Sequence, residues 1–129
     1  WASPLELLDK GQGDCEDYAI SKYFSLLALG MPASRLRLVY VRLQAGALGE
    51  GQAHMVLAFY PQPGAEPLIL DNLIGDVRPA SRRPDLTPVF SFNSEGLWQG
   101  VGTQSAGDPQ ARLSRWREVL AKARAEGFL

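Results

Sequence analysis

Residues 11–20 read GQGDCEDYAI, and this stretch decides how the elements on either side of it are arranged. Its two glycines interrupt helical structure, so any helix before them must be short. Asp14 is a preferred residue for capping a helix N-terminus, and the helix formers after it predict a helix over residues 15–29. Cys15, the only cysteine of the chain, therefore stands one residue after a helix cap.

A cysteine at a helix start has a favourable position for a nucleophile. The unpaired N–H groups and the positive end of the helix dipole stabilise a thiolate, which lowers the pKa of the thiol. The alternative is that Cys15 is a small buried hydrophobic residue, because free cysteines usually are. His54, the only histidine, also has two interpretations, since a lone histidine in an apolar strand is more often structural than catalytic.

Three carboxylates surround the thiol, at Asp14, Glu16 and Asp17. Their negative charge opposes thiolate formation and raises the pKa of the thiol. Acidic residues also stabilise a helix N-terminus, so they have a structural explanation. A bound Ca²⁺ would resolve the conflict, because it prefers oxygen ligands and would offset their charge. The spacing of an EF-hand loop is absent, so other groups would have to complete such a site.

The rest of the chain predicts one α+β domain over residues 1–129, with helices packed on a mostly antiparallel sheet. Ser3, Pro4 and Glu6 form a capping-box pattern for a short first helix. The hydrophobic patterns predict strands at 35–43, 53–60 and 67–70 and a further strand at 89–92. Loops are expected at 44–52, 75–88 and 100–107, and a last helix begins at Asp108 and Pro109, with apolar residues at 3–4–3 spacing up to Gly127.

The composition excludes several classes of protein. The net charge is −1 and the hydrophobic fraction is 46%, which argue against nucleic-acid binding and against general disorder. One cysteine excludes an intrachain disulfide and multi-cysteine metal sites. No apolar run approaches the roughly 20 residues that span a bilayer, so membrane insertion is not expected. No signal peptide is visible, and we expect that an N-terminal extension with an export signal is missing.

The second and third predicted strands bring His54 close to Asp71. If the two strands form a hairpin around Pro63 and Gly64, paired residue numbers sum to about 127. Asp71 then lies opposite Val56 and diagonal to His54 on the same face, roughly 7–8 Å away at Cα. The carboxylate could hold the imidazole while its other ring nitrogen faces Cys15, as in a nucleophile–base–acid triad. These three residues could instead bind zinc, although they lack the close-spaced ligand pairs of common zinc sites.

Short motifs along nearly the whole chain resemble the bacterial transglutaminase-like cysteine proteinases. They are WASP at 1–4, GQGDCEDYAI at 11–20, KYFSL at 22–26, AHMVL at 53–57, LDNL at 70–73, FSFN at 90–93 and LW at 97–98. The resemblance implies a papain-like/transglutaminase-like fold with Cys15 as nucleophile, His54 as base and Asp71 as orienting acid. It also implies a calcium-dependent enzyme, with Asp14 and Glu16 at the calcium-associated positions and Asp17 as a third ligand.

For that family the resemblance implies a specific biology. The enzyme is a periplasmic endopeptidase that cleaves a very large surface adhesin near its N-terminus, at a paired-alanine site. Cleavage releases the adhesin and disperses the biofilm. The implied inhibitor is a LapD-like inner-membrane receptor, which sequesters the protease when its cytoplasmic part binds cyclic-di-GMP.

Two other functions fit the same residues. A transglutaminase would use the same triad but transfer the acyl group to an amine instead of water. A non-catalytic binding domain would use an exposed surface, for which the candidates are Arg78, Arg82, Arg83 and Trp98. Incorporation of an amine without cleavage of the peptide bond would favour the transglutaminase. A Cys15 without enhanced reactivity toward iodoacetamide would favour the binding domain.

Overall fold

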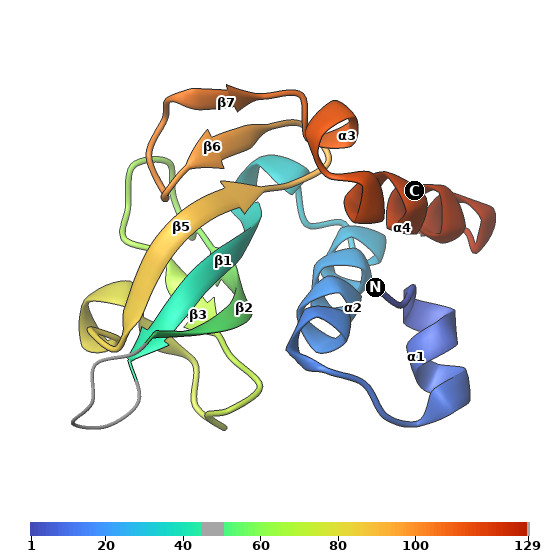
Figure 1. Ribbon diagram of the computed structural model, residues 1–129, viewed down its shortest axis with the longest axis horizontal. Helices are drawn as coiled ribbons and strands as arrows, with labels where there is room; N and C mark the ends of the chain where they lie inside the picture. Colours follow the sequence, from blue (N-terminus) through green and yellow to red (C-terminus); the bar gives the residue numbers. More distant parts are fainter. Residues whose placement is uncertain (45–50, 129) are drawn as a thin grey trace.

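The computed structural model describes residues 1–44 and 51–128, in which the helices lie on one side of an antiparallel sheet (Figure 1). This confirms the α+β prediction. The helices are α1 (Pro4–Lys10), α2 (Cys15–Ala28), α3 (Pro109–Arg112) and α4 (Ser114–Ala125), with 3-10 turns at Ala33–Arg35 and Ala80–Arg82. The strands are β1 (Leu36–Gln44), β2 (Gly51–Phe59), β3 (Leu68–Leu70), β4 (Arg78–Pro79), β5 (Leu86–Phe92), β6 (Leu97–Gln99) and β7 (Ser105–Gly107).

Side-chain caps fix the start of the first two helices where the sequence predicts them. Ser3 accepts a hydrogen bond from the backbone N–H of Glu6, and the Glu6 side chain accepts one from Ser3, which completes a capping box. Asp14 and Asp17 form the same reciprocal pair at the start of α2. Each box satisfies backbone N–H groups that have no partner inside the helix, so both helix starts are set by local chemistry.

The sheet has the strand order β4-β3-β2-β1-β5-β6-β7. The hairpin of β2 and β3 has the predicted register, with Leu57 opposite Leu70 and Phe59 opposite Leu68. Because β3 pairs with only three residues of β2, no strand of residues 1–44 and 51–128 pairs with β2 around Met55 on the edge away from β1. The N-terminal end of α2 approaches this edge, so the short third strand leaves room for the candidate site.

The two faces of the sheet carry separate hydrophobic clusters. The face toward the helices packs residues of β1, β2 and β5 against α2 and α4, with Trp116 fully buried among Tyr23, Phe24 and Phe92. The opposite face is a smaller cluster of Val39, Val41, Val56, Ala58 and Ile69. The alternation along β2 places His54 on the side of Val56, as the sequence predicts.

Several predicted boundaries are wrong, and short elements account for most of the errors. The region predicted as a loop over 75–88 contains β4, a 3-10 turn and the start of β5, and the loop predicted over 100–107 contains β7. Strand β6 was not predicted at all. Of the loop predicted over 44–52, residues 45–50 lie outside the described residues, and the last two residues belong to β2. Strands of two or three residues are too short to show an alternating pattern.

The predicted C-terminal helix is divided in two. Leu113 has φ −117° and ψ 89°, which is not helical, and it separates α3 from α4. The buried residues of α4 are Trp116, Val119, Leu120 and Ala123, in agreement with the predicted spacing. Leu113 is partly buried and packs against the same core. The apolar spacing therefore continues across the break, although the backbone at Leu113 is not helical.

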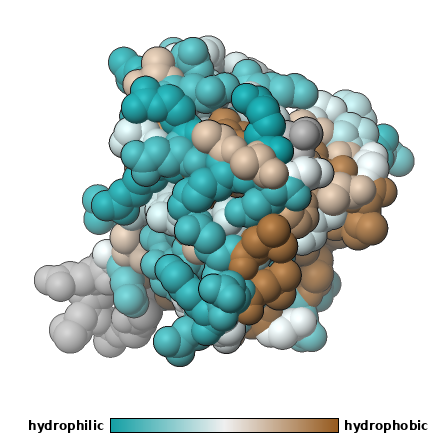
Figure 2. Space-filling model, turned by 90° about the vertical axis from the view of Figure 1, so that its right-hand side faces the viewer, coloured by the Kyte–Doolittle hydropathy of each residue, from teal (hydrophilic) through white to brown (hydrophobic). Residues whose placement is uncertain are grey.

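None of the described helices combines the length and the apolar character needed to cross a membrane. The face shown in Figure 2 is largely hydrophilic, with hydrophobic residues gathered toward one side. Among the described residues, large apolar side chains with high exposure include Leu8 at 76% and Leu29 at 82%.

Candidate active site

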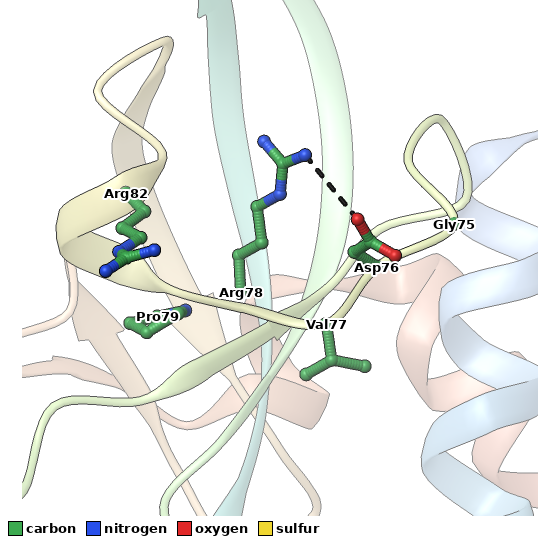
Figure 3. Close-up of a pocket in the computed structure, with 6 residues that line it drawn as sticks. All are labelled: Gly75, Asp76, Val77, Arg78, Pro79 and Arg82. Atoms are coloured by element: carbon green, nitrogen blue, oxygen red, sulfur yellow. Dashed lines mark ion pairs between the residues drawn. The ribbon is translucent and has the colours of Figure 1, made fainter.

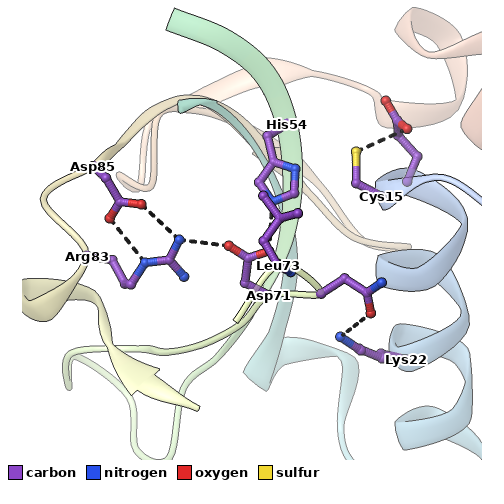
Figure 4. A network of polar contacts seen from close by, with 9 residues as sticks. Cys15, Lys22, His54, Asp71, Leu73, Arg83 and Asp85 are labelled. Carbon is purple, nitrogen blue, oxygen red and sulfur yellow. Dashed lines mark hydrogen bonds and ion pairs between the residues drawn. The ribbon is translucent and has the colours of Figure 1, made fainter. Parts of the chain in front are cut away.

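Three elements carry the predicted triad, and they meet at the open edge of β2. Cys15 is the first residue of α2, His54 lies in β2, and Asp71 follows β3 directly. Figure 4 shows Cys15 on the helix side of His54 and Asp71 beneath the imidazole ring. The structure thus gathers residues that are up to 56 positions apart in the chain.

His54 and Asp71 form a buried pair. His54 Nε2 lies 2.7 Å from Asp71 Oδ1, and the two side chains are 5% and 0% exposed. An ionised carboxylate only accepts hydrogen bonds, so Nε2 carries the proton and Nδ1 of a neutral ring is unprotonated. This contact is the one that the hairpin register predicts.

Asp71 is held by more than the imidazole. Leu73 N–H donates to Oδ1 at 3.0 Å, and Arg83 Nη2 donates to Oδ2 at 2.8 Å. Burial works against ionisation, but the hydrogen bonds from Leu73, His54 and Arg83 outweigh it and hold the pKa of Asp71 below its usual value. Asp71 is therefore an anion at neutral pH, as an orienting acid must be.

Arg83 was predicted to be part of an exposed surface, and this prediction is wrong. Its side chain is 3% exposed, and it lies between Asp71 and Asp85. Arg78 and Arg82 are exposed as predicted. They line a surface hollow in which Arg78 pairs with Asp76 at 3.7 Å (Figure 3). A buried carboxylate with one oxygen toward a histidine needs a donor for its second oxygen, but the sequence does not indicate which nearby arginine supplies it.

The Cys15 thiol is partly buried, and it donates to Glu16 Oε2 at 3.3 Å. In the described part of the chain its side-chain partner is thus Glu16 and not His54. Burial, the hydrogen bond to Glu16 and the nearby negative charges raise the pKa of the Cys15 thiol to about 11. A backbone hydrogen bond from Met55, beside His54, lowers the pKa and offsets part of this rise.

The raised pKa agrees with the conflict predicted from the sequence, in which neighbouring carboxylates oppose the thiolate. At neutral pH the thiol of this arrangement is protonated. It reacts only when a base removes its proton or when the charge of Glu16 is offset.

We expect Glu16→Gln to lower the pKa of Cys15 from about 11, because the substitution removes both the carboxylate acceptor and its charge. Alkylation by iodoacetamide at pH 8 in the presence of EGTA should become severalfold faster, since the thiolate is the reacting form. The pH dependence of the alkylation rate measures the shift. Glu118→Gln, an exposed acid on α4, is the matched control and should leave the rate unchanged.

The three predicted calcium ligands have different surroundings. Both oxygens of Asp17 accept backbone N–H groups, from Ala2 at 2.8 Å and from Asp14 at 3.2 Å. Asp14 Oδ1 accepts from Asp17 at 3.0 Å. One oxygen of Asp14 and one of Glu16 accept no protein hydrogen bond among the described residues. Asp17 thus joins the N-terminal segment to α2, whereas Asp14 and Glu16 each have one oxygen that the described residues leave available as a ligand.

The donor chemistry of Asp14 and Glu16 fits a hard cation such as Ca²⁺, which prefers carboxylate and carbonyl oxygens. Within residues 1–44 and 51–128, no three histidine, cysteine or acidic side chains converge on one point as a metal cluster. In that part of the chain, Cys15, His54 and Asp71 therefore do not form a three-ligand cluster that would support zinc binding. The assignment of Asp14, Glu16 and Asp17 as calcium ligands stays a prediction.

Comparison with solved structures finds chains of the same fold. EGTA-treated LapG from Legionella pneumophila superimposes with a TM-score of 0.84 at 48% sequence identity, over 95% of this chain and 63% of that chain. Calcium-bound LapG from the same organism gives a TM-score of 0.81 at 46% identity, over 95% and 64%. The chain thus spans a little under two thirds of the length of LapG. No curated protein sequence matches the chain.

A comparison with protein families gives the same result. Residues 1–104 match the model of the bacterial transglutaminase-like cysteine proteinase BTLCP. The matched region contains α2 with Cys15, the hairpin with His54 and Asp71, and the strands that support them. The chain therefore belongs to the bacterial transglutaminase-like cysteine proteinases.

Proposed function

We propose that the protein is a calcium-dependent cysteine endopeptidase that works by acyl transfer with Cys15, His54 and Asp71. The observation that carries this proposal is the buried His54–Asp71 pair, at 2.7 Å, which leaves Nδ1 of the ring available beside the start of the nucleophile helix. Membership of the cysteine proteinase family and the likeness to LapG support it.

The mechanism follows from the protonation states. His54 Nδ1 takes the proton from the Cys15 thiol, and the thiolate attacks the carbonyl carbon of the scissile peptide. The imidazolium, stabilised by Asp71, then gives that proton to the leaving amine, and a thioester on Cys15 remains. Water, deprotonated by His54, hydrolyses the thioester and regenerates the thiol. The backbone N–H of Cys15 at the helix start is one donor to the oxyanion.

Asp14 and Glu16 would hold the calcium ion, because each has a carboxylate oxygen at the start of α2 that accepts no hydrogen bond from the described residues. A bound Ca²⁺ supplies positive charge that offsets the carboxylates near the thiol. Glu16 would then serve as a ligand instead of accepting the thiol proton. Structures of Legionella LapG in calcium-bound and EGTA-treated forms support this part of the proposal.

Removal of calcium tests this proposal. We expect EGTA to abolish cleavage of a peptide with a paired-alanine site, and excess Ca²⁺ to restore it. Asp14→Asn and Glu16→Gln should raise the calcium concentration needed for half-maximal cleavage by about tenfold or more, since each removes a charged ligand. Asp108→Asn, the cap of α3, is the control with an equal change of charge. Full cleavage in excess chelator would contradict the calcium dependence.

We further propose the biological setting that the family suggests. The substrate is the N-terminal region of a large surface adhesin in the periplasm, and its cleavage releases the adhesin and promotes biofilm dispersal. The regulating partner is a LapD-like inner-membrane receptor of cyclic-di-GMP that inhibits the protease. Binding of the purified receptor domain to this chain, measured with and without adhesin substrate, tests both assignments.

A further inference from the structure

A buried arginine contacts the carboxylate of the proposed triad through the oxygen that His54 does not use. Arg83 Nη2 donates to Asp71 Oδ2 at 2.8 Å, and the two side chains are 3% and 0% exposed. Figure 4 shows Arg83 on one side of Asp71 and the imidazole of His54 on another. Both oxygens of Asp71 therefore have a defined partner, and the carboxylate cannot rotate without breaking one of these bonds.

The guanidinium of Arg83 is itself fixed. Asp85 accepts two hydrogen bonds from it, from Nε at 3.1 Å and from Nη2 at 3.0 Å. The backbone is also held, because Arg83 N–H donates to Ala80 and Leu86 N–H donates to the carbonyl of Arg83. The guanidinium is thus fixed by its hydrogen bonds to Asp85, and the backbone that carries it is fixed as well. A planar group held in this way is preorganised, so it can set the orientation of Asp71.

Asp85 also balances the charge of Arg83. An arginine alone beside Asp71 would neutralise the carboxylate and weaken its attraction for an imidazolium. With Asp85 on the other side of Arg83, the three groups carry a net charge of −1 at neutral pH, because one cation stands between two anions. The imidazolium that forms during acyl transfer is then opposed by a cluster of net charge −1, which an arginine without Asp85 would not provide.

We infer that Arg83 is a positioning residue, which fixes Asp71 so that His54 keeps its proton on Nε2 and offers Nδ1 to the thiol. The effect on rate rests on the proposed function. The effect on the imidazole does not, because the contacts exist without substrate. An ion pair that only joins the residue after β3 to the segment before β5 would contribute to stability and leave the tautomer of the ring unchanged.

NMR spectroscopy reads the imidazole directly, since His54 is the only histidine of the chain. In ¹⁵N-labelled wild-type protein we expect the neutral ring as the Nε2–H tautomer, with a slowly exchanging Nε2–H proton because the side chain is buried. In Arg83→Gln this proton signal should disappear and the ring nitrogens should show a mixture of tautomers. Arg82→Gln removes the neighbouring exposed arginine and should leave the spectrum unchanged.

Kinetics of peptide cleavage give the second readout. We expect Arg83→Gln to lower kcat by about 10- to 100-fold with little change in KM, as for loss of a supporting hydrogen bond to a catalytic group. Arg83→Lys keeps the charge but not the planar fork, so it should restore part of the rate and part of the Nε2–H signal. If Arg83→Gln does not fold, the comparison of Arg83→Lys with Arg82→Gln decides the question.

Variants of Arg83 that melt at a lower temperature but keep the Nε2–H signal and the wild-type kcat would overturn the inference and leave Arg83 a structural residue. A wild-type protein that cleaves no peptide would refute the proposed function, while the spectra of His54 would still decide the role of Arg83.

Discussion

Replacing Cys15 by alanine is expected to lower the rate of peptide cleavage by a factor on the order of 10⁶, because the thioester can no longer form. The chain has no second cysteine that could take over the attack. The rate of cleavage of a paired-alanine peptide in saturating Ca²⁺, followed by mass spectrometry, measures this loss.

The same substitution should barely change the fold. Cys15 is only partly buried, so the free energy of unfolding should change by less than about 1 kcal/mol, and the thermal midpoint is the control. The caps that start α2 come from Asp14 and Asp17 and remain intact. Cleavage at an undiminished rate by a folded Cys15→Ala protein would exclude Cys15 as the nucleophile.

Replacing Asp71 by alanine should reduce both activity and stability. Without the carboxylate, His54 loses the bond that fixes its tautomer, and kcat should fall by about 10³- to 10⁴-fold, as in triads that lose their acid. Arg83 loses its fully buried partner and keeps the partly exposed Asp85. This should cost toward the lower end of about 3–5 kcal/mol in the free energy of unfolding. Denaturant unfolding and peptide cleavage measure the two effects.

Asp76→Ala is the matched control, since it removes an exposed carboxylate from the same segment. Asp76 pairs only weakly with Arg78, at 3.7 Å and with side chains that are 78% and 44% exposed. We expect its kcat to match the wild type and its unfolding free energy to change by less than about 0.5 kcal/mol. Equal losses of activity in the Asp71 and Asp76 variants would contradict the special role of Asp71.

The sequence alone predicts the part of the site that depends on regular periodicity. A hairpin has a period of two residues, so the turn at Pro63 and Gly64 is enough to place Asp71 beside His54. The observed pairing of Leu57 with Leu70 confirms that register. The caps at Ser3 and Asp14 were likewise predictable, because each cap involves residues only three positions apart.

Arg83 shows what the sequence does not determine. It lies in an irregular segment rich in proline and arginine, where no period indicates which side chain turns inward. Its burial depends on a tertiary contact, namely the hydrogen bond that it donates to the second oxygen of Asp71. The same holds for Glu16, because its position next to Cys15 in the chain does not by itself determine that its carboxylate accepts the thiol proton. The short strands β6 and β7 also form because neighbouring backbone is available to pair with them.

Intact-mass spectrometry of the protein, quenched with acid during turnover of a paired-alanine peptide, tests the central claim most directly. The acyl-transfer mechanism predicts an added mass equal to that of the N-terminal product minus one water, located on Cys15 as a thioester and lost on incubation with Ca²⁺ at neutral pH. The released product should carry oxygen from ¹⁸O-labelled water at its new C-terminus, whereas a transglutaminase would transfer the acyl group to an added amine. Cleavage that proceeds in the Cys15→Ala protein, or an acyl group located on another residue, would contradict the mechanism.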